Sequence, residues 1–199
     1  MREIAKLAAI LFVICAIAAG ALAGTNALTY DKIEAINAEN AAKARQNVMS
    51  SADDITEKIE DSKVEEIAGK LGITTDVLNE IYVAKSGGEV VGYTIKCTNG
   101  GFGGGIGVLT GIDSEGNVTG VAVLSHAETP GLGANATNES WISQYNGKSI
   151  NSPINVIKSG TAGQSDIVAI TGATITSKAV TGAVNYAGQA YLELVGGNK

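Results

Sequence analysis

The sequence predicts an α+β protein in which a single N-terminal transmembrane helix precedes an antiparallel-sheet domain with flanking helices. Three observations support this fold class. Residues 7–28 form an apolar stretch without a charged side chain. Four β-type runs separated by glycine-containing turns follow between residues 81 and 124. After residue 174, apolar residues recur at helical spacing. We expect residues 1–28 to be a cytoplasmic tip and anchor, 29–79 a helical connector and 80–199 the folded domain.

Composition excludes several classes of function. With 199 residues, 45% hydrophobic and 17% charged, the chain is large enough for one core plus an appendage. The net charge is -6, and no run of Lys or Arg is interleaved with aromatic residues, so a nucleic-acid partner is not expected. Cys15 and Cys97 are far apart and there is a single His, so the sequence predicts neither a metal nor a haem site.

The N-terminal apolar stretch is close to the length of about 20 residues that a membrane-spanning helix needs. Arg2 and Lys6 precede it, whereas acidic residues bracket the lysine that follows it. The positive-inside rule therefore predicts a cytoplasmic N-terminus and an exported domain at the cell membrane. A cleavable signal peptide is the alternative, because residues 21–23 read Ala-Leu-Ala. We favour a retained anchor because the apolar run exceeds the signal-peptide core of about 7–15 residues.

The connector is predicted to be helical. Residues 29–70 are rich in Ala, Glu, Asp and Lys and contain no Pro, which predicts two helices divided near residues 50–53. Asp53 or Asp54 is expected to cap the second helix. The apolar face of that helix would comprise Ile55, Ile59, Val64 and Ile67. A short helical turn is expected at residues 73–79.

The next segment is predicted to be an antiparallel meander. Its expected strands are residues 81–85, 90–98, 106–112 and 118–124, and the turns between them contain Gly beside polar residues. The glycine-rich segment 99–107 lacks the G-x-G-x-x-G fingerprint and follows no βαβ pattern, so a dinucleotide fold is not expected. Two interpretations stay open for this segment: a loop whose backbone approaches a flat ligand or a partner, and a flexible hairpin connection.

A second loop, residues 125–134, follows the last strand of the meander. His126 lies two residues before Glu128, but no nucleophile or metal cluster accompanies this pair, so the sequence does not support hydrolysis. Taken alone, the loop is best interpreted as a turn at Pro130-Gly131. A short helix at residues 140–145, with aromatic residues packed on the sheet, and a strand at 154–158 are expected next.

Residues 166–180 combine a strand, a turn and the start of a helix. The strand is predicted at residues 167–170, and the helix presents an apolar face made of Val180, Val184, Ala187, Tyr191 and Leu194. The junction carries hydroxyls and a cation at Thr171, Thr174, Thr176, Ser177 and Lys178. Because backbone N–H groups and the dipole at a helix N-terminus favour anions, the pattern suits a phosphate. The alternative is that these are only capping and turn residues.

In their order along the chain, these features resemble one known family. The motifs are the single anchor, the loop at residues 101–104, the Glu-Thr-Pro-Gly-Leu-Gly loop at 128–133, Trp141 with Gly147-Lys148 behind it, and Thr-Gly-Ala-Thr-Ile-Thr-Ser at 171–177. The set resembles the FMN-binding domain of the G subunit of Rnf-type ion-translocating electron transport complexes. That protein is related to the C subunit of the Na⁺-translocating NADH:quinone oxidoreductase. The resemblance identifies residues 80–199 as an FMN-binding domain.

The resemblance implies a covalent FMN, attached through its phosphate to Thr174 by a flavin transferase that consumes FAD outside the cytoplasmic membrane. The family usually has an Asp where this chain has Val168, and Asp166 lies two residues further back. The expected cofactor site comprises Thr174 with Thr171, Gly172, Ala173, Thr176, Ser177 and Lys178, and a second wall of Glu128, Thr129, Pro130, Gly131, Leu132 and Gly133.

By the same resemblance, the chain is expected to transfer electrons within a membrane complex that couples electron flow between ferredoxin and NAD to export of Na⁺ or H⁺. It would be an enzyme only as a subunit of this redox-driven translocase, with other integral and peripheral subunits as partners. The anchor has no Asp, Glu, Lys, Arg or His between Lys6 and Asp31, so ion transport is assigned to those partners. The alternatives are a stand-alone extracytoplasmic flavin-linked carrier or reductase component, the C subunit of the quinone reductase, and a non-catalytic exported binding module.

Overall fold

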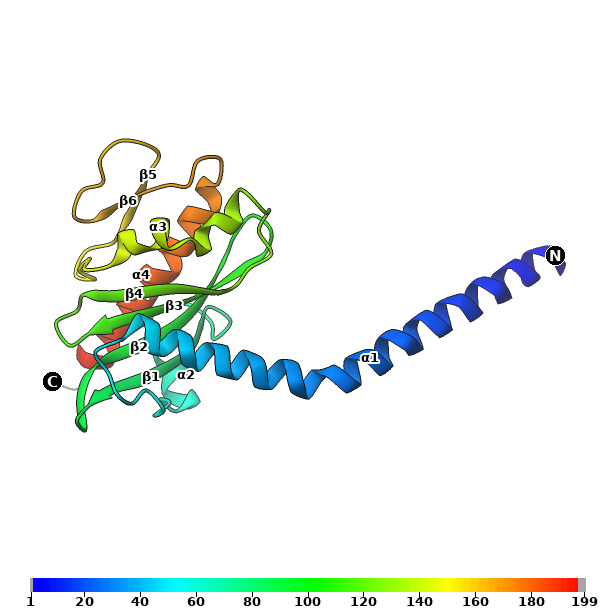
Figure 1. Cartoon of the computed structure of the whole chain (residues 1–199), viewed down its shortest axis with the longest axis horizontal. Coiled ribbons are helices and arrows are strands. Elements are labelled where there is room, and N and C mark those ends of the chain that lie inside the picture. The colour runs from blue at the N-terminus through cyan, green and yellow to red at the C-terminus, as the bar shows by residue number, and fades with distance from the viewer. Residues whose placement is uncertain (1, 197–199) are drawn as a thin grey trace. The chain divides into compact units, whose positions relative to one another are not determined.

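The computed structural model describes residues 2–196, and the chain divides into two units, residues 1–41 and 42–199. Helix α1 (Arg2–Val48) is drawn in Figure 1. Its residues up to 41 belong to the first unit, and residues 42–48 belong to the second. An 18-residue window of α1 has a mean hydropathy of 2.6 and none of it is buried, so its length and composition suit a membrane span. A signal sequence would share these properties. The first connector helix predicted from the sequence is not separate, because α1 continues without a break to residue 48.

The prediction of a second connector helix is wrong for the first half of that segment. Helix α2 (Asp61–Lys70) begins only at residue 61, and the residues before it are extended along the outer edge of strand β1 (Leu78–Ser86). The edge of a sheet offers unpaired backbone groups, and this segment satisfies some of them. The contacts are the bridges Asp54↔Lys85 and Lys58↔Tyr82, and the 2.9 Å hydrogen bond from Ile59 N to Ile81 O.

The two aspartates expected to cap that helix have other roles. Asp53 accepts a 2.9 Å hydrogen bond from the backbone N–H of Gly87, in the turn after β1. Asp54 accepts bonds from the backbone N–H and the hydroxyl of Thr56, at 3.0 and 2.7 Å. Both carboxylates therefore stabilise turns at the sheet edge, where pairing with a distant strand outweighs local helix propensity.

The predicted meander is confirmed. Strands β1, β2 (Glu89–Gly100), β3 (Gly105–Asp113) and β4 (Val118–Ser125) form one four-stranded antiparallel sheet in the order β1-β2-β3-β4 (Figure 1). Each connection is a hairpin, so every strand is paired with its neighbour in sequence. The α+β fold class predicted from the sequence is confirmed with it.

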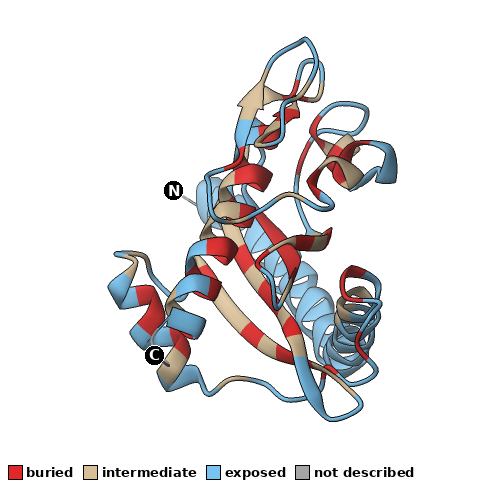
Figure 2. Ribbon diagram, turned by 90° about the vertical axis from the view of Figure 1, so that its left-hand side faces the viewer, coloured by how far each residue is buried: buried red, intermediate tan, exposed pale blue. Residues whose placement is uncertain are grey.

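Helix α4 (Thr174–Gly196) packs across one face of this sheet and forms the main core. The apolar positions predicted for its inner face, Val180, Val184, Ala187, Tyr191 and Leu194, are all buried. Figure 2 colours the buried residues of the chain red. Tyr191 meets Tyr93 of β2 edge to face, with ring centroids 5.8 Å apart. The helix is thereby held with its N-terminus at the end of the sheet where the β2–β3 turn lies.

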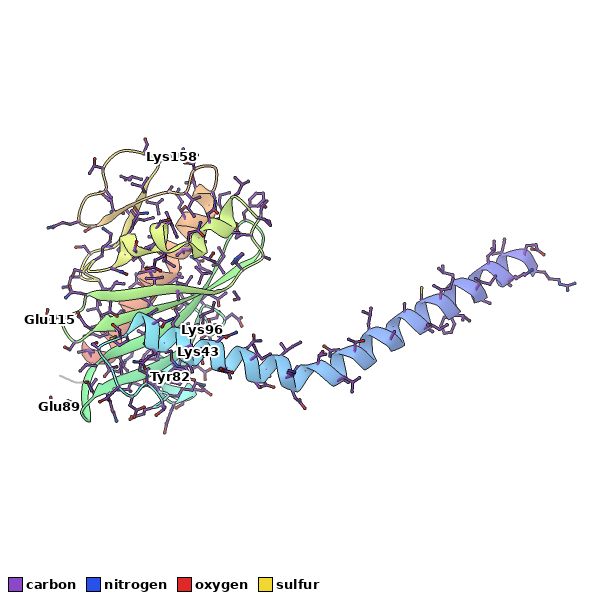
Figure 3. The ribbon with its side chains drawn as sticks, in the orientation of Figure 1. Lys43, Tyr82, Glu89, Lys96, Glu115 and Lys158 are labelled. Atoms are coloured by element: carbon purple, nitrogen blue, oxygen red, sulfur yellow. The ribbon has the colours of Figure 1, made fainter. Side chains whose placement is uncertain are left out.

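The opposite face of the sheet is covered by the end of α1 and the residues after it. Val48 and Met49 lie so close to Gly92, Gly111 and Gly120 that a Cβ atom at these glycines would overlap them. Further along this face, Lys96 contacts Glu80, with Nζ and Oε1 3.2 Å apart. Tyr82, labelled with Lys96 in Figure 3, lies on this face too, and its ring centroid is 4.0 Å from the guanidinium carbon of Arg45.

Short elements connect β4 to α4. They are the 3₁₀ helix η1 (Gly133–Thr137), α3 (Glu139–Ile142), the 3₁₀ helix η2 (Ser143–Tyr145), and strands β5 (Asn155–Ile157) and β6 (Asp166–Val168). The predicted helix at 140–145 is α3 together with η2, and its aromatics Trp141 and Tyr145 are buried. The last two predicted strands exist, but they pair in parallel with each other in a separate sheet.

Candidate functional site

Side chains of α3 and η2 hold the strand that leads into the turn before α4. Gln144 Oε1 accepts a 2.8 Å hydrogen bond from Val168 N, and Val168 O accepts a 2.8 Å bond from the indole of Trp141. The chain then turns at Gly172, whose φ of 77° lies in the left-handed region that favours glycine. Helix α4 begins two residues later, so Thr174 is its first residue.

The hydroxyls of this junction have different environments. Ser177 is buried; its Oγ donates to Ala173 O at 2.9 Å and accepts from Ile170 N at 3.0 Å, so it stabilises the turn itself. Thr176 is also buried and donates to Glu128 at 2.6 Å. Thr171 is exposed in the turn, whereas Thr174 is partly buried.

Thr174 lines a cavity of about 340 Å³ at the N-terminus of α4. This volume is at the lower end of the range of about 300–1,000 Å³ typical of small-molecule sites. The first N–H groups of a helix have no intrahelical acceptor and carry the positive end of its dipole. The cavity is lined by Phe102, Glu128, Thr129, Leu132, Gly133, Gly172, Ala173, Thr174, Ile175 and Thr176.

Glu128 joins the three segments that build this cavity. Its side chain is buried, with the residue only 6% exposed. Oε2 accepts the 2.6 Å bond from the Thr176 hydroxyl in α4, and Oε1 accepts a 2.9 Å bond from Gly103 N in the β2–β3 turn. Burial alone raises the pKa of this carboxyl, but the hydrogen bonds from Thr176, Gly103 and Phe102 outweigh it and hold the pKa below its ordinary value. Glu128 is therefore ionised at neutral pH.

Glycines let the backbone approach this carboxylate closely. A Cβ atom on Gly101 would lie 2.5 Å from Glu128 Oε1, and one on Gly133 would overlap Oε2. A Cβ on Gly103 would overlap the carbonyl oxygen of Ala127. The glycine-rich segment is thus a loop packed against residues 127 and 128 of the second loop. The backbone of this segment closely approaches another loop of the same chain. Its approach to a flat ligand or a partner stays a prediction.

The structure brings together eight of the thirteen residues predicted for the site: Glu128, Thr129, Leu132, Gly133, Gly172, Ala173, Thr174 and Thr176. The other five lie outside the set of lining residues: Thr171, Ser177, Lys178, Pro130 and Gly131. Lys178 was expected to offset the charge of a phosphate, but it lines a different hollow, beside Asn155 and Asn185. Gly131 has a φ of 78°, consistent with the turn predicted for it.

Sequence reasoning missed two lining residues, Phe102 and Ile175. The sequence did contain an indication that Phe102 belongs to the site, because it is an aromatic residue between glycines in a motif that supported the resemblance. Ile175 is an exposed apolar residue outside the buried face of α4, which is a weak signal alone. His126 meets Glu128 through the backbone: its Nδ1 accepts a 3.2 Å bond from the backbone N–H of Glu128.

Known proteins resemble the chain in sequence and in fold. A family model described as the FMN-binding domain matches residues 101–189. The G subunit of the Na(+)-translocating ferredoxin:NAD(+) oxidoreductase complex of Acetobacterium woodii is 46% identical over 97% of this chain and 94% of the relative. The G subunit of the ion-translocating oxidoreductase complex of Methanosarcina acetivorans is 33% identical over 94% of this chain and 93% of the relative.

Two solved structures share the fold. The C subunit of the Na(+)-translocating NADH-quinone reductase of Parabacteroides distasonis aligns with a TM-score of 0.51 and 27% identity, over 58% of this chain and 62% of that one. NqrC of Shewanella oneidensis aligns with a TM-score of 0.55 and 20% identity, over 75% and 74% of the two chains, which shows the fold alone. From the extent and identity of the sequence matches, this chain belongs to the family of G subunits of ion-translocating oxidoreductase complexes and contains an FMN-binding domain.

Proposed function

We propose that this chain is an electron-transfer subunit of an Rnf-type membrane complex and that it carries FMN bound covalently to Thr174. The complex would couple electron flow between ferredoxin and NAD to export of Na⁺ or H⁺, as the names of its relatives indicate for them. Ion transport itself is assigned to partner subunits, because α1 has no Asp, Glu, Lys, Arg or His between Lys6 and Asp31.

One observation supports the assignment of Thr174. Thr174 lines the cavity, and its hydroxyl is not used to hold Glu128 or the turn, as those of Thr176 and Ser177 are. Thr176 and Ser177 are buried and hold Glu128 and the turn. Thr171 is exposed and lies outside the set of lining residues. Thr174 is half-buried at the start of α4, where helix amides can bind phosphoryl oxygens.

The proposed attachment reaction transfers the FMN half of FAD, through its phosphorus atom, to the Thr174 hydroxyl. The Thr174 oxygen forms a bond to the phosphorus of the FMN half, the pyrophosphate P–O bond breaks, AMP leaves, and the hydroxyl proton passes to a base of the flavin transferase. The bound flavin then supplies the electron-carrying chemistry. The protein's own residues would have positioning roles: the α4 amides would bind the phosphate, Gly172 and Ala173 would leave room beside it, and Glu128 holds the surrounding loops together.

The orientation follows from the same reasoning. A retained anchor with Arg2 and Lys6 on its cytoplasmic side puts the FMN domain outside the cytoplasmic membrane, where the transferase acts. A reporter fused to the C-terminus should be active only outside the cytoplasm. Activity of a cytoplasmic reporter at this position would overturn the orientation.

Covalent attachment is tested by expressing the full chain with a flavin transferase, denaturing it and measuring its mass. The expected gain is FMN less one water, with flavin fluorescence in a denaturing gel. Thr174→Val should abolish both signals, while Thr171→Val, a matched change in the adjacent turn, should keep them. Wild-type protein without flavin, or a Thr174→Val variant that retains it, contradicts the assignment. Co-purification with other membrane proteins of the complex then separates a complex component from a stand-alone carrier.

A further inference from the structure

Phe102 is an aromatic residue that the fold keeps out of its core. It lies in the β2–β3 turn, its residue surface is 72% exposed, and it lines the same cavity as Thr174. Burial of a phenyl ring is favourable, so a folded chain generally buries such a side chain unless its backbone prevents this. Exposed at the cavity, Phe102 is accessible to an apolar ligand bound there.

The backbone on both sides of Phe102 is fixed to the rest of the site. Gly101 N donates to Gly104 O at 2.7 Å, which closes the backbone turn that contains Phe102. Gly103 N donates to Glu128 Oε1 at 2.9 Å, and the Phe102 N–H also interacts favourably with this carboxylate. Because Glu128 is itself bonded to α4 through Thr176, the turn is held at a defined place relative to Thr174.

Two more exposed apolar side chains line the cavity. Leu132, from the second loop, is 46% exposed, and Ile175, from the first turn of α4, is 56% exposed. Three separate segments thus each contribute one apolar side chain to one cavity. A planar conjugated ring tethered at Thr174 would cover such side chains, and an aromatic ring prefers offset or edge-to-face contact with it.

We propose that Phe102 contacts the isoalloxazine ring of the flavin directly, with Leu132 and Ile175 as its apolar companions, and that Glu128 is the positioning residue that presents it. This inference rests on the proposed function, because it assumes a flavin tethered at Thr174. It assigns the glycine-rich turn a role in holding the ring rather than the phosphate.

The test replaces Phe102 by Trp, an aromatic side chain that quenches flavin fluorescence on contact. The full chain is loaded with flavin by the transferase, purified in detergent and checked by mass for complete loading. Phe102→Trp should lower native flavin fluorescence at least fivefold relative to wild type, with recovery on denaturation. Val90→Trp is the matched control: Val90 is also exposed but lies at the other end of β2, roughly 35 Å away at about 3.4 Å per residue. It should leave the fluorescence unchanged.

A second arm keeps this inference separate from the covalent assignment. Thr174→Val protein, with and without Phe102→Trp, is titrated with free riboflavin, which lacks the phosphate. Saturable quenching only with Trp at position 102 supports the ring contact even if no covalent flavin forms in the wild type. Equal fluorescence of the Phe102→Trp and Val90→Trp proteins in the loaded arm, or no saturable quenching when loading fails, overturns it. Unchanged flavin fluorescence combined with lost co-purification of partner proteins would instead identify Phe102 as a protein-docking residue and also overturn it.

Discussion

Replacement of Glu128 should reveal that one buried carboxylate holds the site together. Glu128→Ala leaves the Thr176 hydroxyl and the Gly103 N–H without their acceptor. Hydrogen bonds to a charged group contribute about 1.5–3 kcal/mol each, so we expect a loss of about 3–6 kcal/mol in the free energy of unfolding. For a folded unit of this size, that corresponds to a fall in Tm of roughly 6–24 °C.

Glu128→Gln should be milder. The amide oxygen can still accept from Gly103 N, and the amide nitrogen can donate to the Thr176 oxygen, so we expect a loss of about 1–2 kcal/mol. A double-mutant cycle of Glu128→Ala with Thr176→Val should give a coupling free energy of about 1–2 kcal/mol, because the two side chains are in direct contact. Glu89→Gln is the control, since Glu89 is exposed on the β1–β2 hairpin labelled in Figure 3.

The assay is thermal unfolding of the flavin-free full-length chain in detergent, followed by tryptophan fluorescence. The chain has one Trp, and Trp141 is buried beside the site with its indole bonded to Val168 O, so its signal reports the folded domain and not α1. Equal stability of Glu128→Ala and Glu89→Gln would refute the reasoning, as would a coupling free energy near zero.

The pH dependence has a defined sign. The pKa of Glu128 is lower in the folded chain than its ordinary value of 4.5, so its contribution to stability is present above about pH 4.5. It is lost as the pH falls through the folded-state pKa. The stability difference between wild type and Glu128→Gln should therefore be constant near neutral pH and shrink below pH 4.5. A difference that grows on acidification would show that the carboxyl is protonated in the folded state.

Three further outcomes are expected. Gly133→Ala should destabilise the domain by about 1–3 kcal/mol in the same unfolding assay, because its Cβ would overlap the buried carboxylate, whereas Gly69→Ala, in open space on α2, should be neutral or stabilising. In a Cys15→Ala background, Cys97 should resist iodoacetamide at pH 8 until the chain is unfolded, because burial raises its pKa to about 12; rapid native labelling would contradict this. Tyr145→Phe should lower stability by about 0.5–1.5 kcal/mol through loss of a buried 2.7 Å bond to a hydroxyl of α4, and an unchanged Tm would show that this bond is not stabilising.

Local patterns predicted most of the secondary structure. The four strands of the meander and the inner face of α4 were predicted because side-chain periodicity and turn residues act over a few positions. The prediction was wrong at residues 54–59, where the helical composition is overridden by pairing with β1. Strand pairing of that kind depends on a partner more than twenty residues away in sequence, which a local pattern does not describe.

By itself, the sequence determined the apolar anchor, the meander, the strand-turn-helix junction and the hydroxyls at its end. Only the tertiary structure decided how these hydroxyls are used: Thr176 donates to Glu128 of a distant loop, Ser177 bonds its own turn, and Thr174 lines the cavity. It also decided that Glu128 bonds residues 25 and 48 positions away, that Phe102 joins Thr174 at one cavity, and that Lys178 does not. The reason is physical: periodicity and capping are properties of neighbouring residues, whereas a buried carboxylate selects its donors among whichever segments packing brings within about 3 Å.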